Sequence, residues 1–219
     1  MRVAVTGTPG TGKTTATDLL ETDLDVIHLN EVITSEEFST DIDEERGSLV
    51  ADMDALAEWL DGREDVIVES HLAHNFGADR VVVLRAHPDT VVSRLRERGN
   101  SDSKARENAG STEPPRAPAH KARENAESTE PPRALARKAR ENARSTEPPR
   151  ALTRKARENA ESEALDVILS EAVHHHGTEN VYEIDTTDRD PGDVAAEIAA
   201  VVAGEREPSA GTVSYVDWL

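Results

Sequence analysis

A short apolar strand runs directly into a glycine-rich loop at the amino terminus, and this combination constrains the fold more than any other feature. Residues 3–5 read VAV, and residues 7–14 read GTPGTGKT, which satisfies the pattern G-x-x-x-x-G-K-[ST] at every fixed position. Apolar Leu19 and Leu20 follow, so the loop is expected between a strand and a helix. This context predicts a phosphate-binding loop in a parallel α/β sheet.

The residue types of this loop suit phosphate binding. Gly10 and Gly12 let backbone N–H groups turn inward around phosphates, and the following helix adds its positive end. Lys13 is expected to reach the β- and γ-phosphates, and the Thr14 hydroxyl is expected to coordinate Mg²⁺. The sequence therefore predicts that the chain binds ATP together with Mg²⁺.

A second apolar run, DVIVESH at residues 65–71, predicts a buried parallel strand that delivers a carboxylate to the phosphate side of the sheet. Glu69 is then the candidate acid of the magnesium shell. Two interpretations of His71 stay open: it orients a water or a substrate, or it is a hydrogen-bonded structural histidine.

The run RVVVLRA at residues 80–86 predicts another buried strand, and a helix is expected to begin at Pro88. Arg98 lies beside Gly99 at the start of a segment expected to move, where an arginine could reach a transferring phosphoryl group. Arg94, on the same helix, could also reach that group, and a solvated charge on the helix face is an equal alternative for it.

The remaining periodicity predicts strands at residues 25–30 and 180–186 and helices at residues 49–62 and 190–204. The alternation of strands and helices predicts a single α/β domain, residues 1–219, with a parallel five-stranded sheet and helices on both faces. Inward-facing positions of the helix at 49–62 are expected at Val50, Met53, Leu56 and Leu60. The three histidines at 174–176 favour a polar helix terminus over a metal site.

A 17-residue repeat occupies the middle of the chain. The letters KARENA recur at residues 104, 121, 138 and 155, and STEPPRA recurs at 111, 128 and 145. Each copy carries a double proline and at most one leucine, so no copy is expected to bury a face, and a solenoid is not expected. Without residues 105–155 the chain reads as a complete protein with an uninterrupted helical pattern. The array is interpreted as an exposed tandem expansion; a basic arm for RNA is the alternative.

The formal net charge is −19, and lysine is scarce. Such a composition resembles that of proteins from extremely halophilic archaea, and an ordinary acidic surface is the alternative. An acidic body disfavours direct DNA binding. No run of about 18 apolar residues exists, so no membrane association and a cytoplasmic location are expected. Cysteine is absent, which excludes thiolate metal sites.

The strings TGTPGTGKTT, VIVESH, VVVLR and SRLRERG, in this order and spacing, resemble the adenylate kinases of the isoenzyme 6 type, the nuclear and archaeal family. The resemblance implies a P-loop nucleoside monophosphate kinase fold and phosphoryl transfer from ATP to AMP or another nucleoside monophosphate. It also implies ATPase activity and a role in 16S rRNA and small ribosomal subunit maturation through a ribosomal protein partner.

Residue roles follow from the same resemblance. The phosphates of ATP would be bound by Gly10, Gly12, Lys13, Thr14 and Thr15, and Arg98 would be the lid residue that contacts ATP. The family places the monophosphate-binding region at residues 30–53 and the lid at about residues 97–160, interrupted here by the repeats at 105–155; residues 205–219 form a carboxyl-terminal tail.

This chain departs from the family pattern in three respects. Glu69 stands where the family has Asp in an Asp-x-His motif, so direct and water-mediated magnesium contacts both stay open. The repeats fall inside the expected lid, and Arg46 is the one basic residue of the monophosphate region. We therefore expect an ATP:AMP phosphotransferase that uses Lys13, Arg98, Glu69 and His71, with two alternatives: an ATPase switch in ribosome biogenesis, or a small-metabolite kinase.

We expect the acidic chain to lose its fold when molar salt is removed, because the screening length grows from about 3 Å at 1 M to about 10 Å at 0.1 M. Circular dichroism during stepwise dilution of KCl measures the transition. A fully folded chain in dilute buffer would contradict this expectation.

Overall fold

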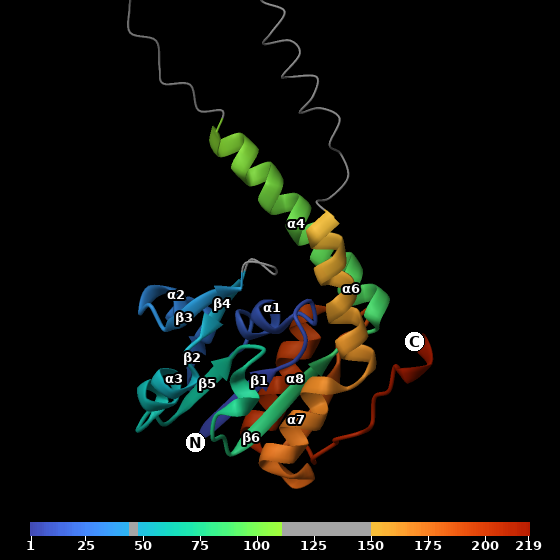
Figure 1. The fold of residues 1–219 in the computed structure, drawn as a ribbon. Coiled ribbons are helices and arrows are strands. Elements are labelled where there is room, and N and C mark those ends of the chain that lie inside the picture. Colours follow the sequence, from blue (N-terminus) through green and yellow to red (C-terminus); the bar gives the residue numbers. More distant parts are fainter. Residues whose placement is uncertain (44–47, 111–149) are drawn as a thin grey trace, which may run out of the picture.

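The computed structural model describes residues 1–43, 48–110 and 150–219, with side chains described for 1–40, 50–99 and 154–219. Its centre is a five-stranded sheet in the order β2-β5-β1-β6-β7 (Figure 1). All neighbouring strands run parallel. The strands are β1 (Arg2–Thr6), β2 (Asp25–His28), β5 (Val66–Glu69), β6 (Arg80–Arg85) and β7 (Val181–Asp185). This sheet confirms the predicted P-loop kinase architecture.

The strands are apolar on both faces because both faces are covered. In β6, Val81 and Val83 pack on one side, whereas Val82 and Leu84 pack on the other. All four side chains are fully buried. Continuous apolar runs of this kind are typical of parallel sheets with a layer of helices on each face.

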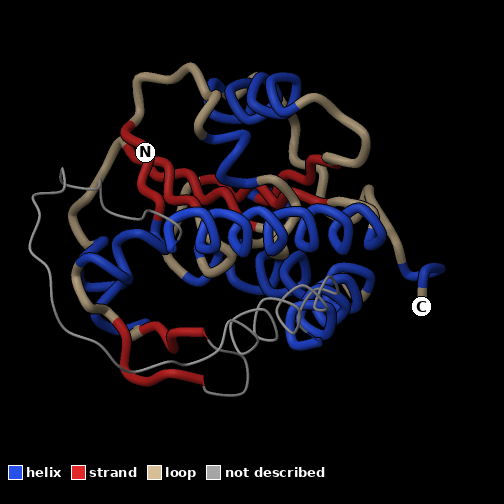
Figure 2. Tube along the Cα trace, turned by 90° about the horizontal axis from the view of Figure 1, so that it is seen from above, coloured by secondary structure: helices blue, strands red, loops and turns tan. Residues whose placement is uncertain are grey.

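The helices divide between the two faces, as Figure 2 shows. One face is covered by α2 (Leu29–Ser35), α3 (Met53–Leu60), the 3-10 turn η1 (Ala73–Asn75) and α7 (Val167–His176). The other face is covered by α1 (Lys13–Thr17) and α8 (Pro191–Ala203). None of the helices in the described ranges is both long and apolar enough to cross a membrane.

The predicted helix at residues 49–62 begins later than expected. Residues 48–51 instead form β4 (Ser48–Ala51), which pairs antiparallel with β3 (Ser39–Asp43) in a separate hairpin. The Asp52 side chain accepts a hydrogen bond from the Ala55 N–H at 3.0 Å and so fixes the start of α3 at Met53. Val50, expected to face inward on a helix, is 43% exposed on the hairpin.

The expected continuous helix after the repeats is also interrupted. Helix α6 (Arg150–Ala164) ends before Asp166, which adopts a left-handed conformation with φ of 54°. Leu165, expected at an apolar position of one helix, is 57% exposed. The carboxylate of Asp166 pairs with the guanidinium of Arg85, and this ion pair offsets the backbone strain.

Helices α4 (Pro88–Gly110) and α6 pack side by side above the end of the sheet nearest α1 (Figure 1). The first KARENA copy lies in α4 and the fourth in α6. Ala156 and Ala160 of the fourth copy are fully buried, with Ala164 one turn further on. The expectation that no copy buries a face is therefore wrong for the fourth, because alanine suffices for a close helix contact. The second and third copies lie outside the described residues.

Arg85, at the end of β6, is buried with its guanidinium among three carboxylates. Its Nε lies 2.7 Å from Glu163, one terminal nitrogen lies 2.6 Å from Glu183, and the other contacts Asp166. Burial favours the neutral form, but the carboxylates of Glu163 and Asp166 outweigh it and raise the pKa of Arg85 above its ordinary value. This residue therefore stays charged and joins α6 to two strands of the core.

The carboxyl-terminal tail follows α8, runs along β7 and returns to the start of α4. The N–H of Thr212 donates to Glu183 at 2.6 Å, and the Tyr215 hydroxyl donates to Asp185 at 2.8 Å. Further on, the indole of Trp218 donates to Asp89 at 3.0 Å. The predicted tail at residues 205–219 is thus an ordered cover for the edge strand.

We expect Arg85→Met to lower the free energy of unfolding by about 3–5 kcal/mol, because it leaves buried carboxylates without a counter-charge. Arg157→Met is the matched control: Arg157 is 78% exposed in its pair with Glu161, so its loss should cost about 0.5 kcal/mol or less. Denaturant unfolding in molar KCl measures both, and equal effects would contradict the structural weight given to Arg85.

Candidate active site

The glycine-rich loop connects β1 to α1 at the carboxyl end of the sheet. Gly10 and Gly12 have φ values of 100° and 92°, a region that disfavours side chains. A Cβ atom on Gly10 would lie 3.1 Å from Leu95 and 3.2 Å from Val91, both in α4. The glycines therefore let the loop curl beneath α4. Helix α1 is five residues long, so the positive charge at its amino-terminal end comes from little more than one helical turn.

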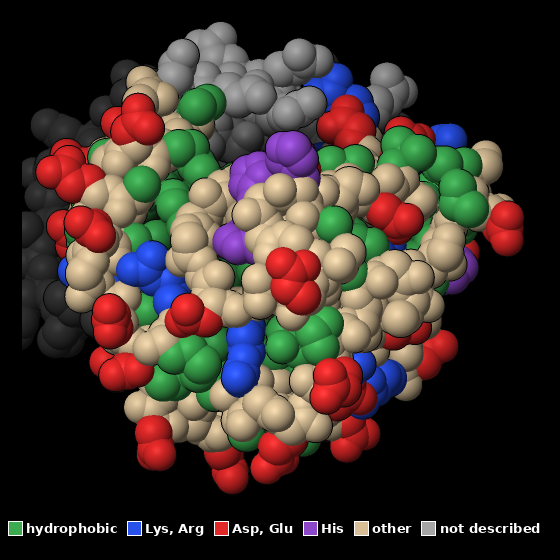
Figure 3. Space-filling view, turned by 90° about the horizontal axis from the view of Figure 1, so that it is seen from below, with side chains coloured by type: hydrophobic (Ala, Val, Ile, Leu, Met, Phe, Trp, Pro, Cys, Tyr) green, Lys and Arg blue, Asp and Glu red, His purple; other side chains and the backbone are tan. Residues whose placement is uncertain are grey.

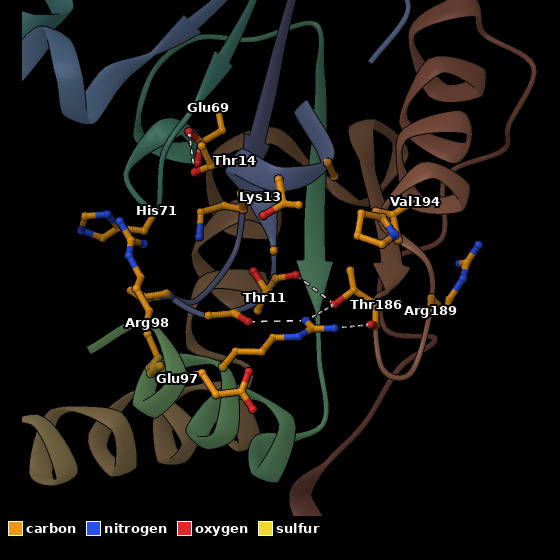
Figure 4. Close-up of a pocket in the computed structure, with 18 of the residues that line it drawn as sticks. Thr11, Lys13, Thr14, Glu69, His71, Glu97, Arg98, Thr186, Arg189 and Val194 are labelled. Atoms are coloured by element: carbon orange, nitrogen blue, oxygen red, sulfur yellow. Dashed lines mark hydrogen bonds between the residues drawn. The ribbon is translucent and has the colours of Figure 1, made fainter. Parts of the chain in front are cut away.

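A cavity of about 480 Å³ opens at this loop (Figure 4). It brings together every residue that the sequence assigned to the site. In Figure 4, Glu69, Thr14 and His71 lie on one side of Lys13, whereas Thr186, Arg189 and Val194 lie on the other. The lining comprises residues 9–16 together with Asn30, Glu69, His71, Arg94, Leu95, Glu97, Arg98, Thr186, Arg189, Pro191 and Val194.

Lys13 is held inside the loop itself. Its ammonium donates to the carbonyl oxygens of Gly7 at 2.8 Å and Thr8 at 3.1 Å, and the side chain is nearly buried. Burial lowers the pKa of Lys13 to about 8, against the opposing charges of Glu69 and Glu163. A phosphate group that enters the loop would supply the counter-charge that these carbonyls only partly provide.

Glu69 lies at the end of β5 and is almost fully buried. Its Oε2 accepts from the Thr14 hydroxyl at 3.3 Å and contacts His28 Nδ1 at 3.0 Å. Its Oε1 is buried and has no hydrogen-bond partner within the described part of the chain. A carboxylate with one oxygen next to a hydroxyl and the other without a partner in that part of the chain offers the oxygen ligands that Mg²⁺ prefers, so Thr14 and Glu69 fit the predicted metal position.

His71 lines the cavity between Lys13 and Arg98, and its side chain points toward Arg98 in Figure 4. Burial, followed by the charge of Lys13, lowers the pKa of His71 to about 4. The imidazole is therefore neutral at pH 7 and a weak base, so it can donate and accept hydrogen bonds but carries no charge.

Two arginines of α4 reach the site. Arg94 donates to the carbonyl of Thr186 at 2.9 Å and to its hydroxyl at 3.0 Å, and it also reaches the carbonyl of Gly10 at 3.5 Å. The interpretation of Arg94 as a solvated charge is therefore wrong. Arg98 lies one turn further along α4, on the cavity wall, and its charge acts on Lys13.

Asn30, the first residue of the predicted monophosphate region, lines the cavity, whereas the sequence did not indicate His28 or Thr186 as site residues. Thr186 ends the predicted strand at 180–186, and His28 lies near the end of the predicted strand at 25–30, so their place at the carboxyl edge of the sheet was the available signal. His176, at the end of α7, contacts the carbonyl oxygen of His74 at 2.8 Å and lies outside this cavity. Arg46 lies outside the described residues.

The comparisons with known proteins agree with this geometry. A family model described as "AAA domain" matches residues 3–113. A protein of Halobacterium salinarum is 46% identical over 220 residues, which cover 100% of both chains. A protein of Natronomonas pharaonis is 48% identical over 219 residues, again 100% of both. A third, from Methanothermobacter thermautotrophicus, is 33% identical over 220 residues, 99% of this chain and 98% of its own. All three are named "Putative adenylate kinase".

The chain belongs to this family of P-loop kinases. In this chain the loop, Glu69 and α4 converge on one cavity at the carboxyl end of the sheet.

Because the pKa of Lys13 is about 8, we expect ATP affinity to weaken by up to about tenfold per pH unit above that value, as the ammonium loses its proton. Lys13→Arg should abolish this pH dependence, since a guanidinium stays charged. Calorimetric titration of ATP in EDTA, from about pH 6.5 to about pH 9.5 at constant KCl, measures it. A flat wild-type profile would contradict the role of the Lys13 charge.

Proposed function

We propose that this P-loop kinase transfers the terminal phosphate of ATP to a nucleoside monophosphate, with AMP as the acceptor. The observation that carries the proposal is the convergence of Lys13, Arg98 and the Thr14–Glu69 pair on one cavity. Relatives with the adenylate kinase name over the full chain length support the same reaction.

Positioning and charge neutralisation account for the proposed catalysis. Lys13 moves from the loop carbonyls to the phosphates, and Arg98 neutralises charge on the transferred group from above. Gly10, Gly12 and Thr15 line the phosphate position with backbone N–H groups. Thr14 and Glu69 would hold Mg²⁺, which when bound neutralises phosphate charge and orients the chain of phosphates.

The acceptor belongs on the Glu69 side of the cavity. There Asn30 lines the wall and accepts a hydrogen bond from Ser70 at 3.1 Å, which leaves its amide N–H groups for other contacts. Residues 30–53 are the proposed monophosphate region, and the lid is proposed over residues 97–160, where α4 and α6 pack above the cavity.

ATP hydrolysis is a second candidate activity, and the position of His71 favours it. A neutral imidazole on the wall of the cavity that holds Lys13 and Arg98 can orient a water through a hydrogen bond. Figure 3 shows acidic side chains scattered over the face seen from below, and the net charge of −19 would attract a basic ribosomal protein. We propose on this basis an isoenzyme 6-type role in small-subunit maturation in the cytoplasm of a halophile. A small-metabolite kinase is the remaining alternative.

ADP formation from ATP and AMP in molar KCl with Mg²⁺ tests the proposal. Lys13→Ala and Arg98→Ala should lower the turnover rate by about 100- to 1,000-fold, because each removes a charge that stabilises the transferred group. Arg96→Ala is the matched control, since Arg96 lies on the same helix but does not line the cavity.

The outcomes separate the candidate functions. Turnover that requires a nucleoside monophosphate supports the kinase, and a panel of acceptors identifies the preferred base. ATP consumption without any acceptor supports the ATPase, in which case ribosomal material should be retained by the immobilised chain. No turnover with any nucleoside monophosphate would rule out the kinase proposal.

A further inference from the structure

His28 contacts the candidate metal ligand Glu69 through one ring nitrogen and a second acid through the other. Nδ1 lies 3.0 Å from Glu69 Oε2, and Nε2 lies 3.3 Å from Asp18 Oδ1. The His28 side chain is 22% exposed, whereas that of Glu69 is 2% exposed. The imidazole is therefore a partly covered link between the protein surface and a buried carboxylate.

The sheet register explains this juxtaposition. His28 and Glu69 are paired residues on the neighbouring strands β2 and β5, and each is the last residue of its strand. Their side chains consequently leave the sheet together at its carboxyl edge, beside the loop. The contact is fixed by backbone pairing, so it does not depend on a mobile segment.

The two oxygens of Glu69 have different surroundings. Oε2 takes the contacts from both His28 and Thr14, whereas Oε1 is buried without a partner in the described ranges. A buried carboxylate oxygen without a hydrogen bond is costly. Because Oε2 is held by His28, the carboxylate cannot rotate freely to satisfy Oε1 elsewhere.

We propose that His28 is a positioning residue for the divalent cation of the bound nucleotide. It holds Glu69 Oε2 next to the Thr14 hydroxyl and so fixes the orientation of the carboxylate, which keeps Oε1 free of other partners among the described residues, for the ion or one of its waters. The inference rests on the proposed function, in that it requires magnesium-dependent nucleotide binding at this site. Side chains that orient metal ligands in this way typically contribute about 10- to 100-fold to metal affinity.

A matched pair of amides tests the geometry. In His28→Asn the side-chain amide occupies the position of Nδ1 and keeps a donor toward Glu69. In His28→Gln the amide reaches the position of Nε2, so it keeps the contact with Asp18 and loses the one with Glu69. Both variants remove the imidazole, and they differ in which acid they address.

The experiment follows binding of a fluorescent ATP analogue to the full chain in molar KCl at neutral pH, first in EDTA and then with increasing Mg²⁺. Affinity in EDTA should be similar for the wild type and both variants, because Lys13 and the loop are untouched. The Mg²⁺ concentration for half-maximal tightening should rise by about 10- to 100-fold in His28→Gln and stay close to the wild-type value in His28→Asn.

Each other outcome overturns the inference in a recognisable way. A wild type that tightens with Mg²⁺ while His28→Gln matches it removes the role of His28 and leaves the proposed function intact. Weak binding in EDTA by both variants would identify His28 as a purely structural residue. A wild type that binds no nucleotide, or binds it without any response to Mg²⁺, would remove the proposed function and this inference together.

Discussion

The buried guanidinium of Arg85 is the interaction on which the arrangement around the cavity depends. It joins α6 through Glu163, the edge strand through Glu183, and the link between α6 and α7 through Asp166. A planar guanidinium with five donors can satisfy three carboxylates at once, which the three donors of a lysine, on a single nitrogen, do not match. Glu163 also accepts the hydroxyl of Thr8, a loop residue, at 2.5 Å. The phosphate loop, helix α6 and the core therefore share one network of ion pairs and hydrogen bonds.

This network holds the helices that cover the cavity. Glu163 anchors the carboxyl-terminal end of α6 to Arg85. Arg94 anchors α4 beside it, because its guanidinium donates to the carbonyl oxygens of Gly10 and Thr186. Residues four apart in a helix share a face. Because Arg94 is fixed, Arg98 one turn later is presented over the same cavity. The contacts of Arg94 thus place the cation of Arg98 above the loop.

The sequence predicted what depends on local pattern and missed what depends on strand order. The loop, the apolar strands and the helix predicted from residue 190 carry their signals within a few residues, and the structure has all of them, with Asp190 as the cap of α8. His28 was missed because its relation to Glu69 exists only once β2 pairs with β5. The break at Asp166 was missed for the same reason, since its partner Arg85 lies 81 residues away. Val50 fits the helical spacing, but the cap at Asp52 starts the helix only at Met53, so Val50 lies in β4.

The fourth copy departs from the repeat pattern at two buried positions. In the first three copies the letters KARENA are followed, after two intervening residues, by Thr and Glu, at 112–113, 129–130 and 146–147; the fourth copy has Glu163 and Ala164 instead. Both replacements are buried, one as the acceptor for Arg85 and Thr8, the other on the stripe of alanines. A Thr-Glu pair at this place would leave Arg85 without this carboxylate and would put an acid on the stripe of alanines, and an unpaired buried acid is costly. The departure of the fourth copy from the pattern therefore supplies the carboxylate that Arg85 needs and keeps the alanine stripe to the end of α6.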